Sequence, residues 1–130
     1  MRHIASSGSP LEPEIGFARA VRVGAHVVVA GTAPLGPDGV TVGEGDVAAQ
    51  TRRCLDVSAE ALVAVGASLS DVVRTRIMLT DIARWREAAT AHGEYFSDIR
   101  PAATFVEVSR FIDPRWLVET EVDAIIDADQ

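Results

Sequence analysis

Residues 71–79, DVVRTRIML, decide the fold. Small or apolar side chains alternate here with longer ones, Val73, Thr75, Ile77 and Leu79 against Arg74, Arg76 and Met78. A period of two residues predicts a β-strand from Asp71 to Leu79. The segments before and after this strand have helical periodicity instead, so the chain combines a sheet with helices.

The segment before the strand is a predicted helix from Asp46 to Val65. Asp46 can cap its first turn, and Gly66 can end it in the left-handed conformation. One stripe at helical spacing is expected to face the core: Val47, Thr51, Cys54, Leu55, Ser58, Leu62 and Val65. We interpret Cys54 as a small core residue rather than a reactive thiol, because no His or Lys is near it in the sequence.

The segment after the strand is a second predicted helix, from Ile82 to Phe96, with Asp81 as its cap. Its inner stripe is expected to be Trp85, Ala89, His92 and Phe96. Because His92 lies on an apolar stripe, we interpret it as a core or interface histidine rather than a ligand.

The remaining segments predict strands and one arm. Five further strands are expected: Phe17–Val23, His26–Ala30, a short Val40–Val42, and then Ala103–Arg110 and Trp116–Ile126 as the closing pair. Residues 1–14 are rich in Ser, Pro and Glu and are expected to form an irregular arm. The order β-β-β-α-β-α-β-β predicts one α+β domain over residues 1–130, with both helices on one face of a mixed sheet.

Composition narrows the function classes. The net charge of −7 argues against an extended nucleic-acid surface, which needs a basic face. The apolar runs are too short to cross a membrane, and residues 1–16 contain no apolar core segment, so we do not expect them to act as a signal peptide. A single cysteine allows neither an intramolecular disulfide nor a thiolate metal cluster, so we expect no metal, no cofactor and a cytoplasmic location.

The second face of the sheet is expected to need a partner. In the last strand Leu117 alternates with Val118, and Val122 with Ile125 and Ile126, so both faces carry apolar side chains. Helices would cover only one of them. An uncovered apolar sheet face predicts a homo-oligomer with sheets meeting at a symmetry axis.

Six segments together resemble the RidA/YjgF/UK114 family of reactive-intermediate deaminases, also labelled endoribonuclease L-PSP. They are IGFARAVRVG (15–24), VVVAGTAP (27–34), DVAAQTRRCLD (46–56), GASLSDVVRTRIMLTDI (66–82), RPAATFVEV (100–108) and VETEVDAI (118–125). The resemblance implies a chorismate-mutase-like fold and a homotrimer with small-molecule sites in the clefts between subunits. It also implies hydrolysis of enamines and imines derived from amino acids to 2-keto acids and ammonia.

One position departs from the active pattern of the family. The resemblance implies that active members share a Pro-Ala-Arg sequence, in which the guanidinium of the arginine binds the substrate carboxylate. This chain has Pro101-Ala102-Ala103 at the same place. Losing such a charge-assisted pair from a buried cleft costs about 2–5 kcal/mol. Phe17 occupies the position where active members often have a Tyr. An Asn that is frequent on the second helix of active members corresponds to about Ala89 in this chain.

The resemblance implies a set of site residues. Glu119 matches the acid that orders water or relays a proton, and is the candidate catalytic residue. The candidate substrate-binding residues are Phe17, Arg19, Gly31, Thr32, Arg76, Ala103 and Thr104. We hypothesise that Arg19 or Arg76 supplies the positive charge that Ala103 lacks.

Three functions stay open at this point. The first is an imine or enamine hydrolase with altered substrate preference, weak or inactive on 2-iminobutyrate. The second is a trimer that binds a small metabolite and has lost the reaction. The third, a ribonuclease, is disfavoured by the acidic charge and by the lack of a basic groove studded with aromatic residues.

Overall fold

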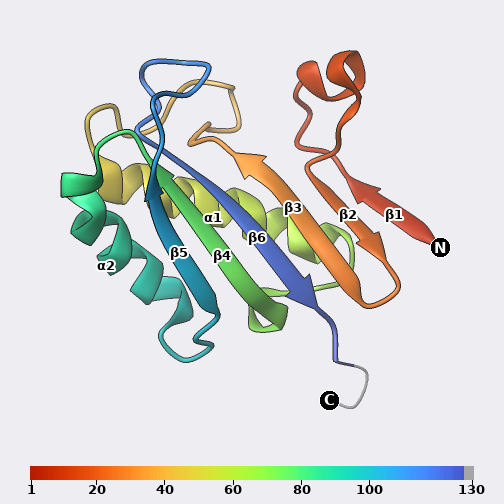
Figure 1. Ribbon diagram of the computed structural model, residues 1–130. Helices are drawn as coiled ribbons and strands as arrows, with labels where there is room; N and C mark the ends of the chain where they lie inside the picture. The colour runs from red at the N-terminus through yellow and green to blue at the C-terminus, as the bar shows by residue number, and fades with distance from the viewer. Residues whose placement is uncertain (128–130) are drawn as a thin grey trace.

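Six strands form one mixed sheet, and both long helices pack against the same face of it (Figure 1). The computed structural model describes residues 1–127. The strands are β1 (Arg2–Ala5), β2 (Ala20–Val23), β3 (His26–Thr32), β4 (Val72–Leu79), β5 (Ala102–Glu107) and β6 (Val118–Ile125). Their spatial order is β1-β2-β3-β6-β4-β5, and only β4 and β5 run parallel, because the second helix carries the chain back between them. The predicted fold class is confirmed.

The first helix, α1 (Val47–Ala64), begins and ends as the sequence predicts. Asp46 Oδ1 accepts a 3.0 Å hydrogen bond from the Ala49 amide, and Gly66 has a φ of 86°. Every residue of the predicted stripe is buried: Val47, Thr51, Cys54, Leu55, Ser58, Leu62 and Val65. This helix therefore closes the centre of the sheet.

Strand β4 keeps the predicted alternation except at its start. Thr75, Ile77 and Leu79 are buried, but Val73 is exposed on the opposite face. The pairing with β6 shifts register between Val72 and Arg74. A bulge of this kind adds one residue to one strand and so reverses the side-chain alternation at that point.

The second helix begins later than predicted. Asp81 caps a short 3-10 turn, η3 (Ile82–Arg84), and α2 (Trp85–Phe96) follows it. The predicted inner stripe is wrong at Trp85, which is 38% exposed, and the buried positions are Ala88, Ala91 and Phe96. A turn with three residues per repeat in place of 3.6 rotates the stripe.

The N-terminal segment is more ordered than an irregular arm. Residues 2–5 pair with β2 as an edge strand, and Glu12–Gly16 form a wide helical turn, η1. At the other predicted short strand, 40–42, the structure has only an isolated bridge from Leu35 to Thr41. The first predicted strand also starts later, at Ala20.

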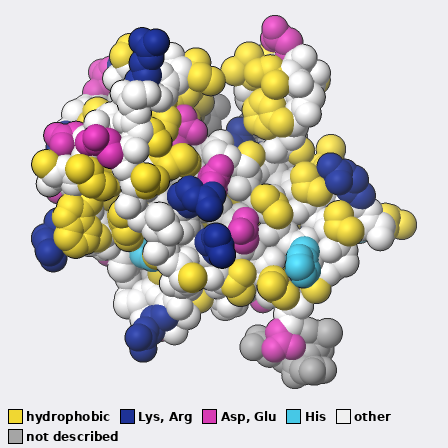
Figure 2. Space-filling view, in the orientation of Figure 1, with side chains coloured by type: hydrophobic (Ala, Val, Ile, Leu, Met, Phe, Trp, Pro, Cys, Tyr) yellow, Lys and Arg dark blue, Asp and Glu magenta, His cyan; other side chains and the backbone are white. Residues whose placement is uncertain are grey.

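The face of the sheet that carries no helix is open and mixed in character. Figure 2 shows charged side chains in the middle of this face with hydrophobic side chains around them. On β6 this face carries the acids Glu119, Glu121 and Asp123, so the expected apolar residues Val118 and Val122 instead face the helices. The exposed apolar side chains come mainly from other strands: Val28, Val73, Val106 and Ile125. Within residues 1–127, no helix is long and apolar enough to span a membrane.

Candidate functional site

Glu119 lies near the start of β6 and points to the open face of the sheet. Its chain neighbours Val118 and Thr120 are fully buried on the helix side, and the alternation of the strand leaves Glu119 half-buried. Burial raises the pKa of the Glu119 carboxyl, the charge of Arg19 partly opposes this, and Glu121 raises it further. A carboxyl with a raised pKa is suited to both accept and return a proton.

Gly31 lies directly against this carboxyl. The pairing of β3 with β6 shifts between Val29 and Thr32, so the bulge leaves Gly31 facing Glu119. A Cβ atom at Gly31 would lie 3.3 Å from Glu119 Oε1. A side chain here would displace the carboxyl, which explains why a glycine occupies the position.

Arg19, the residue directly before β2, approaches the same place. Its Nη1 donates to the Gly31 carbonyl at 2.6 Å and to Thr32 Oγ1 at 3.2 Å. The guanidinium lies over the Phe17 ring, 5.5 Å from its centroid. Burial lowers the pKa of Arg19, while the charges of Glu12 and Glu119 raise it, so the side chain stays a cation between two acids.

Glu12 is the functional neighbour that the sequence does not reveal. It is 4% exposed, and its Oε2 accepts hydrogen bonds from the Ser7 amide at 3.1 Å and the Ser7 hydroxyl at 2.5 Å. Burial pushes the pKa of Glu12 upward, but these hydrogen bonds and the charge of Arg19 outweigh it and lower the pKa. The pattern Glu-Pro-Glu gives no sign of this contact, because it depends on η1 folding back over β2.

Arg76 and Thr104 lie on the same open face but outside this cluster. Arg76 forms an ion pair with Glu121, its register partner on β6, and Thr104 is the register partner of Arg76 on β5. The Arg76–Glu121 ion pair reduces the repulsion between Glu119 and Glu121, the two neighbouring acids on this face of β6, because Arg76 neutralises Glu121. The structure thus brings Phe17, Arg19, Gly31, Thr32 and Glu119 together and leaves Arg76 paired elsewhere.

Ala103 lies on the opposite face from Glu119. Its register partner is Thr75, which is fully buried on the helix side, whereas Glu119 is opposite Met78 on the open side. Strand β5 is also two strands away from β6 in the sheet. Within one chain, Ala103 and Glu119 therefore cannot contact one ligand.

A second group of side chains lies on the same face of the sheet as Ala103. Thr75 Oγ1 and His92 Nε2 are 2.8 Å apart, and the His92 ring lies 5.8 Å from the Phe105 ring. Phe105 in turn meets Trp85 edge-on at 6.1 Å. Burial lowers the pKa of His92, so its ring is favoured in the neutral form.

Thiol and metal chemistry find no support in the described residues. Cys54 is fully buried under β6, its Sγ lies 3.7 Å from the Val118 carbonyl, and burial raises the pKa of its thiol. Among residues 1–127, no group of three or more His, Cys, Asp or Glu side chains is arranged to hold a metal ion. The chemistry available to the Glu119 cluster is proton transfer and the orientation of water.

The strand order, the two helices on one face and the acid of the last strand define a class of protein. The family model for Endoribonuclease L-PSP matches residues 8–126, so the chain belongs to that family, also called RidA/YjgF/UK114. The resemblance predicted from the sequence is confirmed.

Particular relatives support this assignment. The crystal structure of Rv2704 from Mycobacterium tuberculosis, described as a member of the YjgF/YER057c/UK114 family, has a TM-score of 0.89 and 48% identity, covering 97% of this chain and 100% of that one. An uncharacterized protein of Streptomyces coelicolor is 42% identical over 118 residues, which cover 91% of this chain and 87% of the relative. The 3-aminoacrylate deaminase RutC of Acinetobacter baylyi is 36% identical over 110 residues, covering 85% and 84%.

Proposed function

We propose that this protein hydrolyses a reactive imine or enamine to a carbonyl compound and ammonia, with a substrate preference altered by Ala103. The observation that carries the proposal is the half-buried Glu119 carboxyl, held against Gly31 and beside Arg19. The membership of the family and a 36% identical relative named as a 3-aminoacrylate deaminase support the reaction class. The reaction needs no cofactor, and the single buried cysteine suits a reducing, cytoplasmic environment.

The reaction consists of proton transfers around one water molecule. The ionised Glu119 accepts a proton from the water as its oxygen attacks the C=N carbon, and passes this proton to the imine nitrogen, which gives a neutral carbinolamine. Glu119 then accepts the proton of the carbinolamine hydroxyl as the C=O bond forms and delivers it to the nitrogen as the C–N bond breaks, so that ammonia leaves and the carboxylate is regenerated. One imine and one water yield one carbonyl product and one ammonia.

Arg19 is better placed than Arg76 to supply positive charge to this cleft. Its guanidinium lies beside Glu119 and fixes the Gly31 carbonyl, whereas Arg76 is held by Glu121. In its present position Arg19 favours the ionised form of Glu119, and so helps the carboxyl to act as a base. Phe17 forms one apolar wall beside it.

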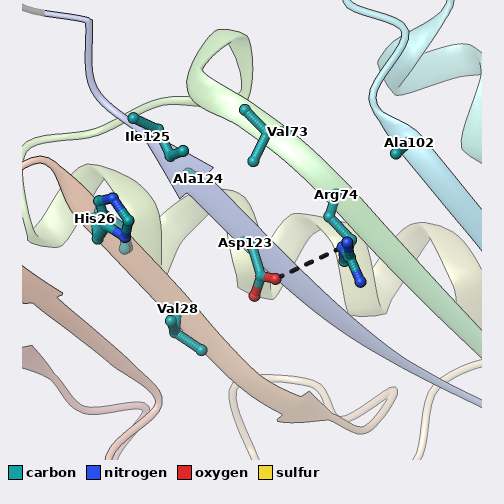
Figure 3. Close-up of a pocket in the computed structure, with 9 residues that line it drawn as sticks. His26, Val28, Val73, Arg74, Ala102, Asp123, Ala124 and Ile125 are labelled. Carbon is teal, nitrogen blue, oxygen red and sulfur yellow. Dashed lines mark ion pairs between the residues drawn. The ribbon is translucent and has the colours of Figure 1, made fainter.

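We further propose that the working unit is a homotrimer with ligand clefts between subunits. Glu119 and Ala103 occupy opposite faces of the sheet in one chain, so a site that contains both positions requires two copies. The open face also has a hollow that an adjoining copy can cover. Figure 3 shows it beside the Arg74–Asp123 ion pair, with Val28, Val73 and Ile125 around it.

One observation favours a second candidate, a trimer that binds a small metabolite without turning it over. Ala103 carries no charge, and its neighbours His92 and Thr75 bond to each other. A cleft built in this way can keep a ligand site after the carboxylate anchor of an active enzyme is gone.

The deciding experiment measures ammonia release from 2-iminobutyrate and from 2-aminoacrylate, each generated in place by a dehydratase. We expect weak acceleration at best on these 2-imino acids, and complete loss of any acceleration in Glu119→Gln. A rate equal to that of relatives with the arginine would refute the altered preference. Acceleration that survives in Glu119→Gln would remove Glu119 from the mechanism.

A further inference from the structure

We infer that the substrate of this cleft is an imine without a carboxylate, bound as its protonated, cationic form. This inference rests on the proposed function and names the substrate class that the same site would take. It follows from the charges that the folded chain gathers around Glu119.

The cluster around Glu119 holds one positive charge and two negative charges. The charges of Glu12 and Glu119 both act on the Arg19 guanidinium, which holds the carbonyl of Gly31, the glycine that lies against Glu119. The only other charge that acts on Glu119 within residues 1–127 is that of Glu121, a third acid that is itself paired with Arg76. With Glu119 ionised, the cluster therefore carries a net negative charge and opposes the entry of an anion.

The hydrogen bonds of Arg19 point to the same conclusion. Its Nη1 is already used on the Gly31 carbonyl at 2.6 Å and on Thr32 Oγ1 at 3.2 Å. These bonds brace the bulge of β3, and the charge of the guanidinium is balanced by Glu12 and Glu119, so Arg19 is a positioning residue and not a carboxylate anchor.

The surface around Ala103, which the proposed trimer would bring opposite Glu119, adds no cation at its centre. The described side chains there are the Ala103 methyl group, the Phe105 ring and His92, which is hydrogen-bonded to the buried Thr75 and which burial favours in the neutral form. The cations near it lie off this surface: Arg74 is the register partner of Ala102 on the open face and is paired with Asp123, and Arg86 lies exposed over the Trp85 ring at 4.5 Å from its centroid. The surface favours an apolar or aromatic substituent where an active relative would hold a carboxylate.

A cationic imine suits the chemistry as well as the charge count. Protonated C=N groups are attacked by water more readily than neutral ones, and an adjacent carboxylate stabilises the cation. The balance then becomes one iminium and one water giving one carbonyl compound and one ammonium ion. Such iminium ions arise where a flavoprotein oxidase converts a primary amine that has no carboxyl group.

The test compares three probes of nearly the same shape and different charge: benzamidine, benzamide and benzoate. Benzamidine presents a planar, cationic C=N group. We expect calorimetric titration of the full-length protein at neutral pH to show about tenfold tighter binding of benzamidine than of benzoate, with benzamide between them. In Glu119→Gln this preference is expected to fall to about threefold or less.

The matched control is Asp123→Asn. Asp123 lies on the same strand and face as Glu119, four residues further along, which is about 13 Å at the rise of a strand. At this distance its charge is largely screened, so the preference for benzamidine is expected to persist. Equal affinity for the three probes, no binding of any, tighter binding of benzoate, or an equal loss in Asp123→Asn would overturn the inference. So would binding of benzoate that disappears in Arg86→Ala.

A second arm separates this inference from the proposed hydrolysis. Phenylalanine and phenethylamine differ only in the carboxylate, and an amino-acid oxidase and an amine oxidase convert them to the corresponding imines with release of hydrogen peroxide. The lag between peroxide and ammonia reports the hydrolysis of each imine. We expect the protein to shorten the lag only for phenethylamine. A shorter lag only for phenylalanine overturns the inference, whereas benzamidine preference without any shortening overturns hydrolysis and leaves the charge selection standing.

Discussion

At the scale of single residues, the site depends on a few close approaches rather than on many polar groups. Glu119 receives its character from three neighbours: the bare backbone of Gly31, the guanidinium of Arg19 and the second acid Glu121. All three neighbours act on the same carboxyl. Substitutions at Glu119 and Gly31 can therefore be compared for their effect on ligand binding and for their effect on the free energy of unfolding.

The first prediction concerns the pH dependence of stability. Because the folded protein raises the pKa of Glu119, the folded state holds this proton more tightly than the unfolded state. Ionising Glu119 thus weakens the fold as pH rises from the ordinary glutamate value, near 4.5, through the raised one. Urea unfolding of Glu119→Gln should show a gain in stability over wild type that grows with pH in this range and then levels off. A variant less stable than wild type at pH 7 would contradict the sign.

The second prediction concerns Gly31→Ala. A Cβ atom at this position would lie 3.3 Å from Glu119 Oε1, so the flexible carboxyl is expected to move and the binding of benzamidine to weaken several-fold. Because Gly31 lacks the positive φ that disfavours alanine, the free energy of unfolding should change by less than about 1 kcal/mol.

Gly93→Ala is the matched control for this change. Gly93 lies inside α2, and a Cβ there would meet no atom within 4 Å. It should raise stability by about 0.5–1 kcal/mol through helix propensity and leave binding unchanged. Weaker binding in both variants would show that Gly31→Ala acts through the fold and not through the carboxyl.

At the scale of elements, local signals predicted the helices and long-range pairing decided the rest. Asp46 and Gly66 fix the ends of α1 within the chain itself, so sequence was sufficient there. Residues 2–5 become a strand only because β2 lies beside them, and Val73 turns outward only because β4 bulges against β6. These outcomes depend on partners distant in sequence.

The candidate site divides in the same way. Gly31 and Glu119 could be named from the family pattern, and the structure places them in contact. The approach of Glu12 to Arg19 could not, because it requires η1 to fold over the sheet. The placement of Ala103 on the opposite face follows from the register of β5 with β4, which the sequence alone leaves undefined.

The third prediction concerns a polar link between elements. Gln50, buried on α1, donates to the Arg115 carbonyl at 2.9 Å and accepts from the Leu117 amide at 2.7 Å, so it fixes the entry to β6. Gln50→Leu removes both hydrogen bonds and leaves the Arg115 carbonyl and the Leu117 amide without them, so it should destabilise the protein by about 2–4 kcal/mol. Chemical denaturation measures the change. Glu60→Gln, on the exposed side of α1, should stay within about 0.5 kcal/mol of wild type, and a similar loss there would point to helix propensity instead.

At the scale of the whole molecule, the two faces of the sheet differ in how they are covered. The helix face is closed by α1 and α2, whereas the open face presents valine and isoleucine side chains around two ion pairs (Figures 1 and 2). The two ion pairs join residues that are register partners on β4 and β6, so these four charges are paired within one chain. A second copy can then cover these two ion pairs without leaving their charges unpaired between the sheets.

The last prediction tests this assembly with two exposed valines. Val28 lies on the open face, and Val63 lies on the outer side of α1; they are 54% and 68% exposed in the single chain. Light scattering should give wild type a mass of about three 13.8 kDa chains. Val28→Lys should dissociate it, because a lysine would be buried between sheets, while Val63→Lys should keep the trimer. A wild-type mass of one chain would refute the trimer, and equal dissociation by both variants would place the interface elsewhere. If Val28→Lys also abolishes benzamidine binding while its circular dichroism stays native, the cleft needs a neighbouring subunit, as the opposite placement of Ala103 and Glu119 requires.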